Sequence, residues 1–149
     1  MARKVFFSFK YEDVSRAMNV RHSWVTKPDK ETAGFIDKAD FEKVKQKGDQ
    51  AIKNWIDNQL KGTSVTVVLV GEKTCQSKWV NYEIEESIKR GNGLLEIDVS
   101  KIKCMQKKTT PRCNWMLDKK YSKHLWNKHK GHENLGQWIK DAAIQAGRN

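Results

Sequence analysis

An indole and a carboxylate, Trp79 and Glu83, lie four residues apart in a stretch with helical periodicity. Residues at i and i+4 share one side of a helix, so the two groups are expected to face the same space. An apolar wall beside a carboxylate excludes water and raises its pKa, and a carboxylate can stabilise positive charge that develops during a reaction. Glu83 could do such chemistry, but on this pattern alone the favoured interpretation is a solvated glutamate, which the helix dipole stabilises early in a helix.

A strand and a loop must position this pair. Val65 to Val70 is a near-continuous apolar run ending at Gly71, which is typical of a strand buried on both faces by helices. A helix is predicted to begin near Ser77 and to stop at Gly91, a glycine suited to the position after a helix. The residues expected on its buried stripe follow at i, i+4 and i+8: Val80, Ile84 and Ile88.

The remaining elements alternate between strand and helix patterns. Strands are predicted at Lys4–Phe9, at Leu94–Val99 and at Tyr121–Trp126, and Gly34–Asp37 is either a very short strand or a loop. Helices are predicted from about Asp13 with Val14, Ala17 and Met18 inside, from Phe41 to Leu60 with Gly48 weakening the middle, and through Leu135, Trp138, Ile139, Ala142 and Ala146. Polar Glu96 and Asp98 indicate that Leu94–Val99 lies near a sheet edge.

This alternation predicts an α/β protein with a flavodoxin-like three-layer sandwich around a mainly parallel, five-stranded sheet. In the strand order 2-1-3-4-5, ligands bind beyond the carboxyl ends of strands 1 and 3. Those ends are Ser8–Tyr11 and Gly71–Glu83 in this chain. The pattern therefore brings both polar loops to one cleft.

Length and composition limit the classes of protein to which this chain can belong. A chain of 149 residues fits one domain, so we expect residues 1–149 to form a single unit in which 100–132 is a variable basic loop region. There is no apolar run long enough to span a bilayer and no hydrophobic N-terminal signal, which predicts a cytoplasmic protein without membrane contact. Three cysteines without paired spacing do not predict a disulfide framework.

Several other chemistries are disfavoured by residue spacing. The three histidines His124, His129 and His132, together with Cys104 and Cys113, form no compact ligand pair, so no metal site is predicted. The absence of a G-x-G-x-x-G or Walker loop disfavours a Rossmann dehydrogenase or a P-loop enzyme. A net charge of +11 raises the affinity for any polyanion, but the Lys and Arg residues are scattered, so binding to nucleic acid is the weakest of the functions considered.

Two stretches of the sequence resemble TIR domains. Val5-Phe6-Phe7-Ser8-Phe9, followed by Glu12-Asp13, is similar to the opening strand of that family, V-F-x-S-F with an acidic pair soon after. Ser77-Lys78-Trp79-Val80-Asn81-Tyr82-Glu83 resembles the family's S-x-W-C-x-x-E segment, with Val80 where cysteine is usual. Further stretches are similar to the TIR-like proteins of the bacterial Thoeris antiphage system: Asn19 to Arg21, Trp24 to Thr26 and Asp49 to Glu83.

The resemblance implies chemistry on NAD, with NAD as a substrate and no bound cofactor. TIR enzymes of the NAD glycohydrolase or ADP-ribosyl cyclase type cleave the bond between nicotinamide and ribose with one glutamate on the third helix, and Glu83 is the matching position. In Thoeris systems the product is a cyclised ADP-ribose messenger that activates a separate effector protein. The transition state resembles an oxocarbenium ion, whose positive charge a carboxylate stabilises.

The same resemblance gives expected substrate-binding residues: Ser8, Phe9, Lys10 and Tyr11 at the first strand end, Asp37 in the loop that rims the site in TIR folds, and Trp79. Phe9 and Tyr11 are placed to stack on a base or on nicotinamide, and Lys10 to meet the diphosphate. Each also has a simpler interpretation, since Phe9 and Trp79 can be packing residues and Lys10 a free surface lysine. The alternative function is a non-enzymatic TIR module that mediates self-association or adaptor contacts.

Overall fold

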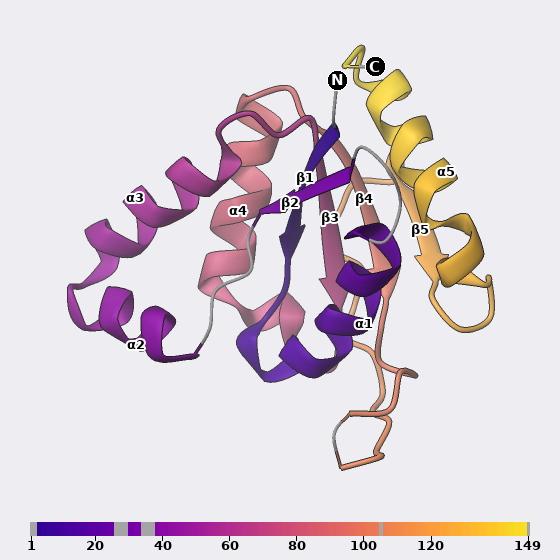
Figure 1. The fold of residues 1–149 in the computed structure, drawn as a ribbon, viewed down its shortest axis with the longest axis horizontal. Helices are drawn as coiled ribbons and strands as arrows, with labels where there is room; N and C mark the ends of the chain where they lie inside the picture. The colour runs from indigo at the N-terminus through magenta and orange to yellow at the C-terminus, as the bar shows by residue number, and fades with distance from the viewer. Residues whose placement is uncertain (1–2, 26–29, 34–37, 105, 149) are drawn as a thin grey trace.

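The computed structural model of the chain describes residues 3–25, 30–33, 38–104 and 106–148. Strands and helices alternate along most of it, except that α3 follows α2 and β5 follows β4 (Figure 1). The strands are β1 (Arg3–Ser8), β2 (Lys30–Ala33), β3 (Val65–Val70), β4 (Gly93–Asp98) and β5 (Ser122–Leu125). The helices are α1 (Val14–Val25), α2 (Lys38–Gln46), α3 (Asp49–Leu60), α4 (Lys78–Lys89) and α5 (Gly131–Gln145). Two short 3-10 turns, η1 (Tyr11–Asp13) and η2 (Thr74–Gln76), precede α1 and α4.

These strands form one sheet in the order β2-β1-β3-β4-β5, and each of its neighbouring pairs is parallel. Val65 of β3 pairs with Val5 of β1 on one side and with Gly93 of β4 on the other. Helices α1 and α5 pack on one face, and α3 and α4 pack on the other (Figure 1). The predicted flavodoxin-like sandwich and its strand order are confirmed. Because all strands run in the same direction, the carboxyl ends of β1 and β3 lie at one edge.

Strand β3 holds the two helical layers together. All six of its residues are buried. Val65, Val67 and Leu69 pack in the cluster that contains α1 and α5, whereas Val68 and Val70 pack against α4 on the opposite face. Burying each such side chain contributes about 1.5–3 kcal/mol relative to exposure. The unbroken apolar run in the sequence is therefore explained by contacts on both faces of one strand.

The inner face of α1 consists of Ala17, Val20 and Trp24, all fully buried. Their spacing of three and four residues follows the helical period. The prediction that Met18 lies inside is wrong, because its side chain is 45% exposed. One residue corresponds to a rotation of about 100° around a helix, so the neighbour of the buried Ala17 points away from the sheet.

The region between α1 and β3 differs from the prediction in two places. The second strand is Lys30–Ala33, whereas the pattern placed a short strand or loop at 34–37, which lies outside the described residues. The single helix expected from Phe41 to Leu60 is instead two helices, α2 and α3, which are separated at Gly48. Gly48 has a φ of 95°, a conformation that residues with a side chain rarely adopt, and this breaks the helical path.

Helix α4 begins where the sequence predicts. The Ser77 hydroxyl accepts a hydrogen bond from the Val80 backbone N–H at 3.2 Å and caps the helix. Val80 and Ile84 are buried, but the prediction for Ile88 is wrong because 51% of it is exposed. The inward position belongs to Ser87, which is fully buried. At 3.6 residues per turn, Ile88 is rotated by about 80° from Val80, and Ser87 by only about 20°.

Strand β4 is interior, contrary to the prediction from Glu96 and Asp98 that it lies near an edge. It pairs with β3 on one side and β5 on the other, and Glu96 is fully buried. The Glu96 carboxylate accepts hydrogen bonds from the backbone N–H groups of Met116 and Leu117 at 2.7 and 3.1 Å, and its other contact is an ion pair with Lys123 at 3.0 Å. Glu96 is therefore polar because it anchors a loop, and not because it faces solvent. A buried polar group needs such hydrogen-bond partners.

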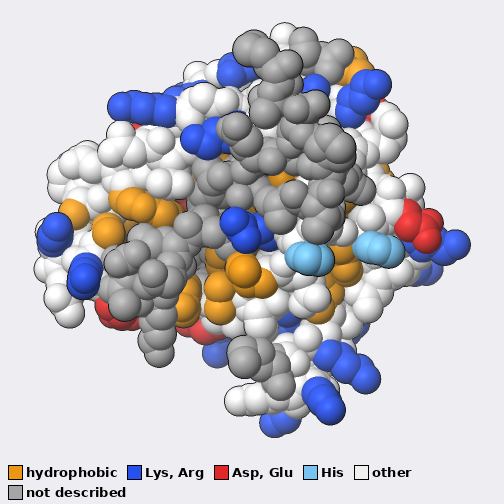
Figure 2. All heavy atoms as spheres, viewed as in Figure 1, with side chains coloured by type: hydrophobic (Ala, Val, Ile, Leu, Met, Phe, Trp, Pro, Cys, Tyr) orange, Lys and Arg blue, Asp and Glu red, His pale blue; other side chains and the backbone are white. Residues whose placement is uncertain are grey.

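The chain between β4 and β5 contains no helix or strand in its described residues. Its first half projects beyond the carboxyl end of β4 (Figure 1). Lys and Arg side chains gather on this projection at the bottom of Figure 2. Arg16 of α1 fixes the base of the projection by donating hydrogen bonds to the carbonyl oxygens of Ile102 and Lys108 at 2.8 and 3.0 Å. None of the described helices combines the length and apolar character that crossing a membrane requires.

Candidate active site

Ser8 and Glu83 meet where β1, β3 and α4 come together. Ser8 is the last residue of β1 and pairs with Val68 of β3. Glu83 lies in the second turn of α4, on the side that packs toward the sheet. The Ser8 hydroxyl donates a 2.6 Å hydrogen bond to Oε1 of Glu83, and both residues are buried. The parallel sheet thus brings together two residues that are distant in sequence.

Burial controls the protonation of Glu83. Removal of the carboxyl group from water raises its pKa to about 8, and the hydrogen bond from Ser8 lowers the pKa but offsets only part of this shift. Desolvation disfavours the charged form, and a hydrogen bond to that form favours it. Glu83 is therefore mostly protonated at neutral pH in the ligand-free protein and is ready to ionise when a positive charge comes near. A carboxyl group with this behaviour is typical of functional sites.

A cavity of about 300 Å³ lies against Glu83. Seven of its thirteen lining residues are aromatic or aliphatic, five are charged and one is a serine: Phe7, Phe9, Lys10, Tyr11, Glu12, Glu42, Lys45, Ile52, Trp55, Ile56, Ser77, Trp79 and Glu83. Mostly apolar cavities with a small number of converging polar groups are the usual form of a small-molecule site. The lining comes from the ends of β1 and α4 and from α2 and α3.

Most of the residues expected in the site are found together. Phe9, Lys10, Tyr11, Trp79 and Glu83 all line the cavity. Ser8 does not line the cavity; it lies beneath Glu83 and holds the carboxyl group. Asp37, the remaining candidate, falls outside the described residues.

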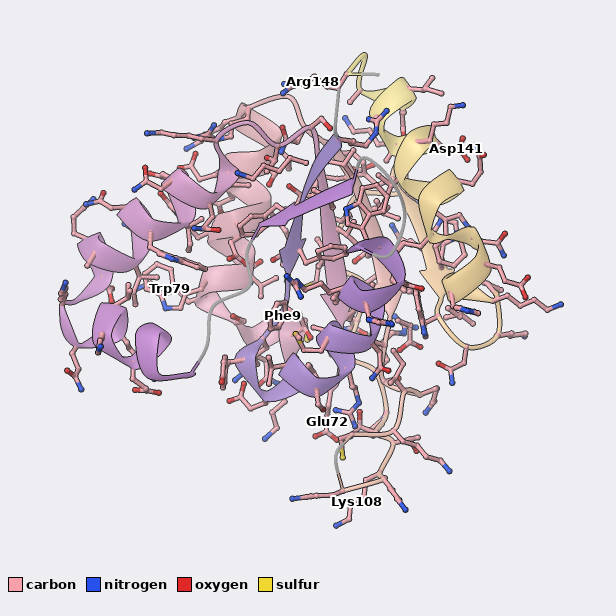
Figure 3. All side chains as sticks on the ribbon, in the orientation of Figure 1. Phe9, Glu72, Trp79, Lys108, Asp141 and Arg148 are labelled. Carbon is pink, nitrogen blue, oxygen red and sulfur yellow. The ribbon has the colours of Figure 1, made fainter. Side chains whose placement is uncertain are left out.

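Trp79 lies at the opening of α4, half-buried beside α3 (Figure 3). Its ring packs against the cluster formed by Phe6 and the inner face of α3, and it meets the Tyr82 ring edge to face with centroids 6.1 Å apart. The Lys78 ammonium lies 4.9 Å from the centre of the same indole. Trp79 is therefore both a packing residue and a wall of the cavity, so the two interpretations of this residue are compatible.

The two residues of the acidic pair lie in different places: Glu12 at the cavity and Asp13 in the protein interior. Glu12 lines the cavity and forms a 3.0 Å ion pair with Lys10. Burial alone would raise the Glu12 pKa, but its backbone hydrogen bond and the contact with Lys10 hold it below its usual value. Lys10 is thus paired in the ligand-free protein, in contrast to the simpler expectation of a free surface lysine.

Asp13 is buried and faces away from the cavity toward the loop after β3. Its Oδ1 accepts a 2.9 Å hydrogen bond from the Arg16 guanidinium. Burial raises the Asp13 pKa, although Arg16 opposes the shift. The carboxylate packs so closely on Gly71 that a side-chain carbon there would collide with it. Asp13 and Gly71 thereby fix the path of the loop that leads into α4.

The wall that α2 and α3 contribute to the cavity was not predicted from the sequence. Glu42 and Lys45 come from α2, and Ile52, Trp55 and Ile56 come from α3. The helix predicted from Phe41 to Leu60 does include Ile52, Trp55 and Ile56. No signal in the sequence linked that helix to the end of β1, because the turn at Gly48 decides where both helices lie.

Histidine and cysteine residues do not converge on a metal position within the described part of the chain. His124 stacks on Trp138 with centroids 4.0 Å apart, and burial together with nearby His129 lowers its pKa to about 4. The His129 ring nitrogen Nδ1 accepts a hydrogen bond from the Leu125 backbone at 2.9 Å. These contacts give both histidines a structural role around the end of β5.

Comparison with known proteins agrees with this geometry. Residues 6–103 match the family model described as "Thoeris protein ThsB, TIR-like domain". Over 105 residues the chain is 44% identical to a Bacillus cereus (strain MSX-D12) protein named "Putative cyclic ADP-D-ribose synthase ThsB1". The match covers 69% of this chain and 55% of that protein, so the chain spans about half the length of the curated relative.

Proposed function

The chain belongs to the Thoeris ThsB family of TIR-like domains, and on this premise we propose that it cleaves NAD and releases a cyclic ADP-ribose type messenger. The name of the Bacillus cereus relative supports processing of NAD, and the geometry of the site supports a particular role for each residue around it. One observation carries the proposal. The buried carboxyl group of Glu83, held by Ser8, forms part of the wall of a cavity that five aromatic side chains also line.

The cavity offers suitable partners for the parts of NAD. Trp79 and Trp55 present aromatic rings against which nicotinamide can stack, and such stacking contributes about 1–3 kcal/mol per base in proteins that bind single-stranded nucleic acid. Lys10 and Lys45 line the same cavity and provide positive charge for the diphosphate. Binding of the diphosphate would compete with Glu12 for the Lys10 ammonium, which lies 3.0 Å from the Glu12 carboxylate.

Glu83 then acts on the reacting sugar. The bond between the ribose carbon and the nicotinamide nitrogen breaks, its electron pair leaves with neutral nicotinamide, and positive charge develops on the ribose. An ionised Glu83 stabilises this oxocarbenium-like charge and can accept hydrogen bonds from the ribose hydroxyls. The nicotinamide ring of NAD is itself cationic, so bound substrate lowers the Glu83 pKa and favours the ionised form that the reaction needs.

The apolar wall of the cavity favours ring closure of the ADP-ribose over its hydrolysis. Phe9, Trp55 and Trp79 restrict the access of water to the side of the cavity next to Glu83. A nucleophilic group elsewhere on the same ADP-ribose can then capture the cationic carbon before water does. The released cyclic nucleotide is the diffusible signal that we propose for a separate effector protein in antiphage defence.

The test is to incubate the purified chain with NAD and to measure nicotinamide and cyclic nucleotide by liquid chromatography and mass spectrometry. The parent protein should form both, and Glu83→Gln should reduce both rates by on the order of a hundred- to a thousand-fold, as loss of one electrostatic contact does elsewhere. Glu85→Gln is the matched control, because Glu85 is exposed on the same helix and should turn over NAD normally.

Three outcomes would change the proposal. Equal turnover by the parent and Glu83→Gln proteins would remove Glu83 from the mechanism. Nicotinamide release with linear ADP-ribose as the only product would replace cyclisation with hydrolysis. No turnover by the folded parent, even with extract from infected cells added, would favour the alternative of a non-enzymatic interaction module.

A further inference from the structure

Two of the three thiols in the chain are neighbours in the fold. Cys75 lies in the η2 turn before α4, and Cys113 lies in the loop after β4, 38 residues later. The Cys75 backbone N–H donates a 3.0 Å hydrogen bond to Sγ of Cys113, which brings the two residues into direct contact. Cys104 lies apart from them in the projecting basic loop, close to Lys108.

The backbone around both cysteines fixes this proximity. The Cys113 N–H donates to the Gly71 carbonyl oxygen at 2.9 Å, and the Gly71 N–H donates to the Thr74 hydroxyl at 2.7 Å. The Cys113 side chain packs against the apolar cluster beneath α4. Each thiol is half-buried, so a small solute can reach the pair although the backbone holds it in place.

We propose that Cys75 and Cys113 form a dithiol site that hydroperoxides oxidise reversibly to a disulfide. The thiolate is the reactive form of cysteine, and a second thiol within reach completes the oxidation to a disulfide. The substrate class is a hydroperoxide small enough to enter between the two loops. This activity is independent of the proposed reaction on NAD.

The two steps balance in atoms and electrons. The Cys75 thiolate attacks one peroxide oxygen, the O–O bond breaks, and the leaving oxygen takes up a proton and departs as water or an alcohol. The resulting sulfenic acid is then attacked by Cys113, the S–O bond breaks, the S–S bond forms and one water leaves. The two sulfur atoms together lose two electrons, which reduce the peroxide. Burial and the neighbouring Cys75 raise the Cys113 pKa, which fits its role as the second thiol.

The disulfide would join two loops next to the candidate active site. Cys75 is two residues before Ser77, which caps α4 and lines the cavity. A covalent link to Cys113 would therefore restrain the start of the helix that carries Trp79 and Glu83. Closing a loop of this length restricts the unfolded chain, so the oxidised protein should melt higher by on the order of 5 °C.

The experiment uses the full chain, reduced and desalted, and treated with hydrogen peroxide at a small molar excess. Intact mass should fall by two hydrogen atoms, and non-reducing peptide mapping should give one cross-linked pair, Cys75 with Cys113. A reductant should restore the original mass and melting temperature. Cys104→Ser should behave like the parent, whereas Cys75→Ser and Cys113→Ser should each lose the cross-link.

A matched sample oxidised in denaturant shows whether the fold selects the pair. The unfolded chain should give mixed pairings that include Cys104. The proposal is overturned if the folded chain gives the same mixture, if oxygen is added without a cross-link, or if the thiols stay reduced under conditions that oxidise the unfolded chain. None of these readouts involves NAD, so failure here leaves the proposed NAD reaction intact.

Discussion

Ser8 donates a 2.6 Å hydrogen bond to Glu83 although 75 residues separate them, and neither side chain is open to bulk water. The bond fixes the position of the carboxyl group and lowers a pKa that burial alone would raise further. Ser8 is therefore a positioning residue for Glu83, and this contact makes the function of the site testable at one hydroxyl group.

The first prediction concerns Ser8→Ala. Removing the hydroxyl leaves a buried carboxyl oxygen without its partner, which costs about 1–3 kcal/mol of stability. The pKa of Glu83 should rise above about 8, because the bond that lowers it is lost. A pH profile of nicotinamide release should show its inflection moved to higher pH in the variant.

Ser87→Ala is the matched control for this prediction. Ser87 is also buried between α4 and the sheet, where its hydroxyl lies 2.7 Å from that of Thr66. It should lose a similar amount of stability and keep the parent's pH profile. Identical profiles for the parent and Ser8→Ala proteins would contradict the positioning role.

The second prediction concerns the pH dependence of the proposed reaction. In that reaction the ionised form of Glu83 stabilises the transition state, and the Glu83 pKa in the free protein is about 8. The rate kcat/KM should therefore rise with pH through that value and reach a plateau above it. At saturating substrate the inflection in kcat should lie lower, because cationic nicotinamide favours the carboxylate. An inflection at the ordinary pKa of glutamate in both profiles would contradict the burial argument.

The third prediction links Glu83 to stability. The folded pKa is raised from 4.5 to about 8, so the folded state keeps a proton that the unfolded state releases in this interval. The stabilisation of the folded state that results from this raised pKa is fully present below pH 4.5 and is lost as the pH rises through about 8. Relative to Glu83→Gln, the parent should lose on the order of 3 kcal/mol between about pH 5 and pH 8.

Denaturant unfolding of both proteins across this pH range measures the difference in their free energies of unfolding. If this difference did not change with pH, Glu83 would titrate normally in the folded protein.

The fourth prediction tests the cavity wall from α3. Trp55→Ala should raise the KM for NAD by about ten- to a hundred-fold, the range expected when one stacking contact is lost. Trp138→Ala is the control: this half-buried tryptophan on α5 stacks on His124, away from the cavity, and should leave KM unchanged. Equal KM values for the parent and Trp55→Ala proteins would place the substrate elsewhere in the cavity.

The fifth prediction compares two glycines. Gly71→Ala would place a methyl group against the Asp13 carboxylate, which Arg16 holds in position, and should destabilise the fold by about 1–3 kcal/mol. Gly136→Ala should be neutral or stabilising by up to about 1 kcal/mol, since it lies in α5 with open space around it. Urea midpoints of the two variants decide the matter; similar midpoints would show that Asp13 moves aside freely.

Much of this structure could be predicted from local patterns. The apolar run of β3 indicated a strand buried on both faces, and the alternation of elements gave the sheet order that places Ser8 beside α4. The spacing of Trp79 and Glu83 put both at one cavity, their motif correctly indicated a TIR-like domain, and the longer stretch from Asp49 to Glu83 correctly indicated the Thoeris type. These features depend on residues close in sequence, for which periodicity is informative.

The remaining features depend on tertiary contacts. The backbone at Gly48 divides one expected helix into two and thereby brings Trp55 to the end of β1. Glu96 suggested an edge strand, because a pattern of polar residues does not distinguish solvent from a protein partner. The contact between Cys75 and Cys113 likewise arises from two loops that no sequence spacing relates.

The contacts of Glu96 also determine where the loop between β4 and β5 can change in length. Its carboxylate binds the amides of Met116 and Leu117, so the second half of the loop between β4 and β5 is fastened to the sheet interior. Insertions between Ile102 and Lys108, whose carbonyl groups Arg16 holds, would extend only the projection, whereas insertions next to Leu117 would pull the tethered amides out of register. Related chains are therefore expected to differ in loop length between these two positions and to keep the distance from Met116 to Lys123 constant.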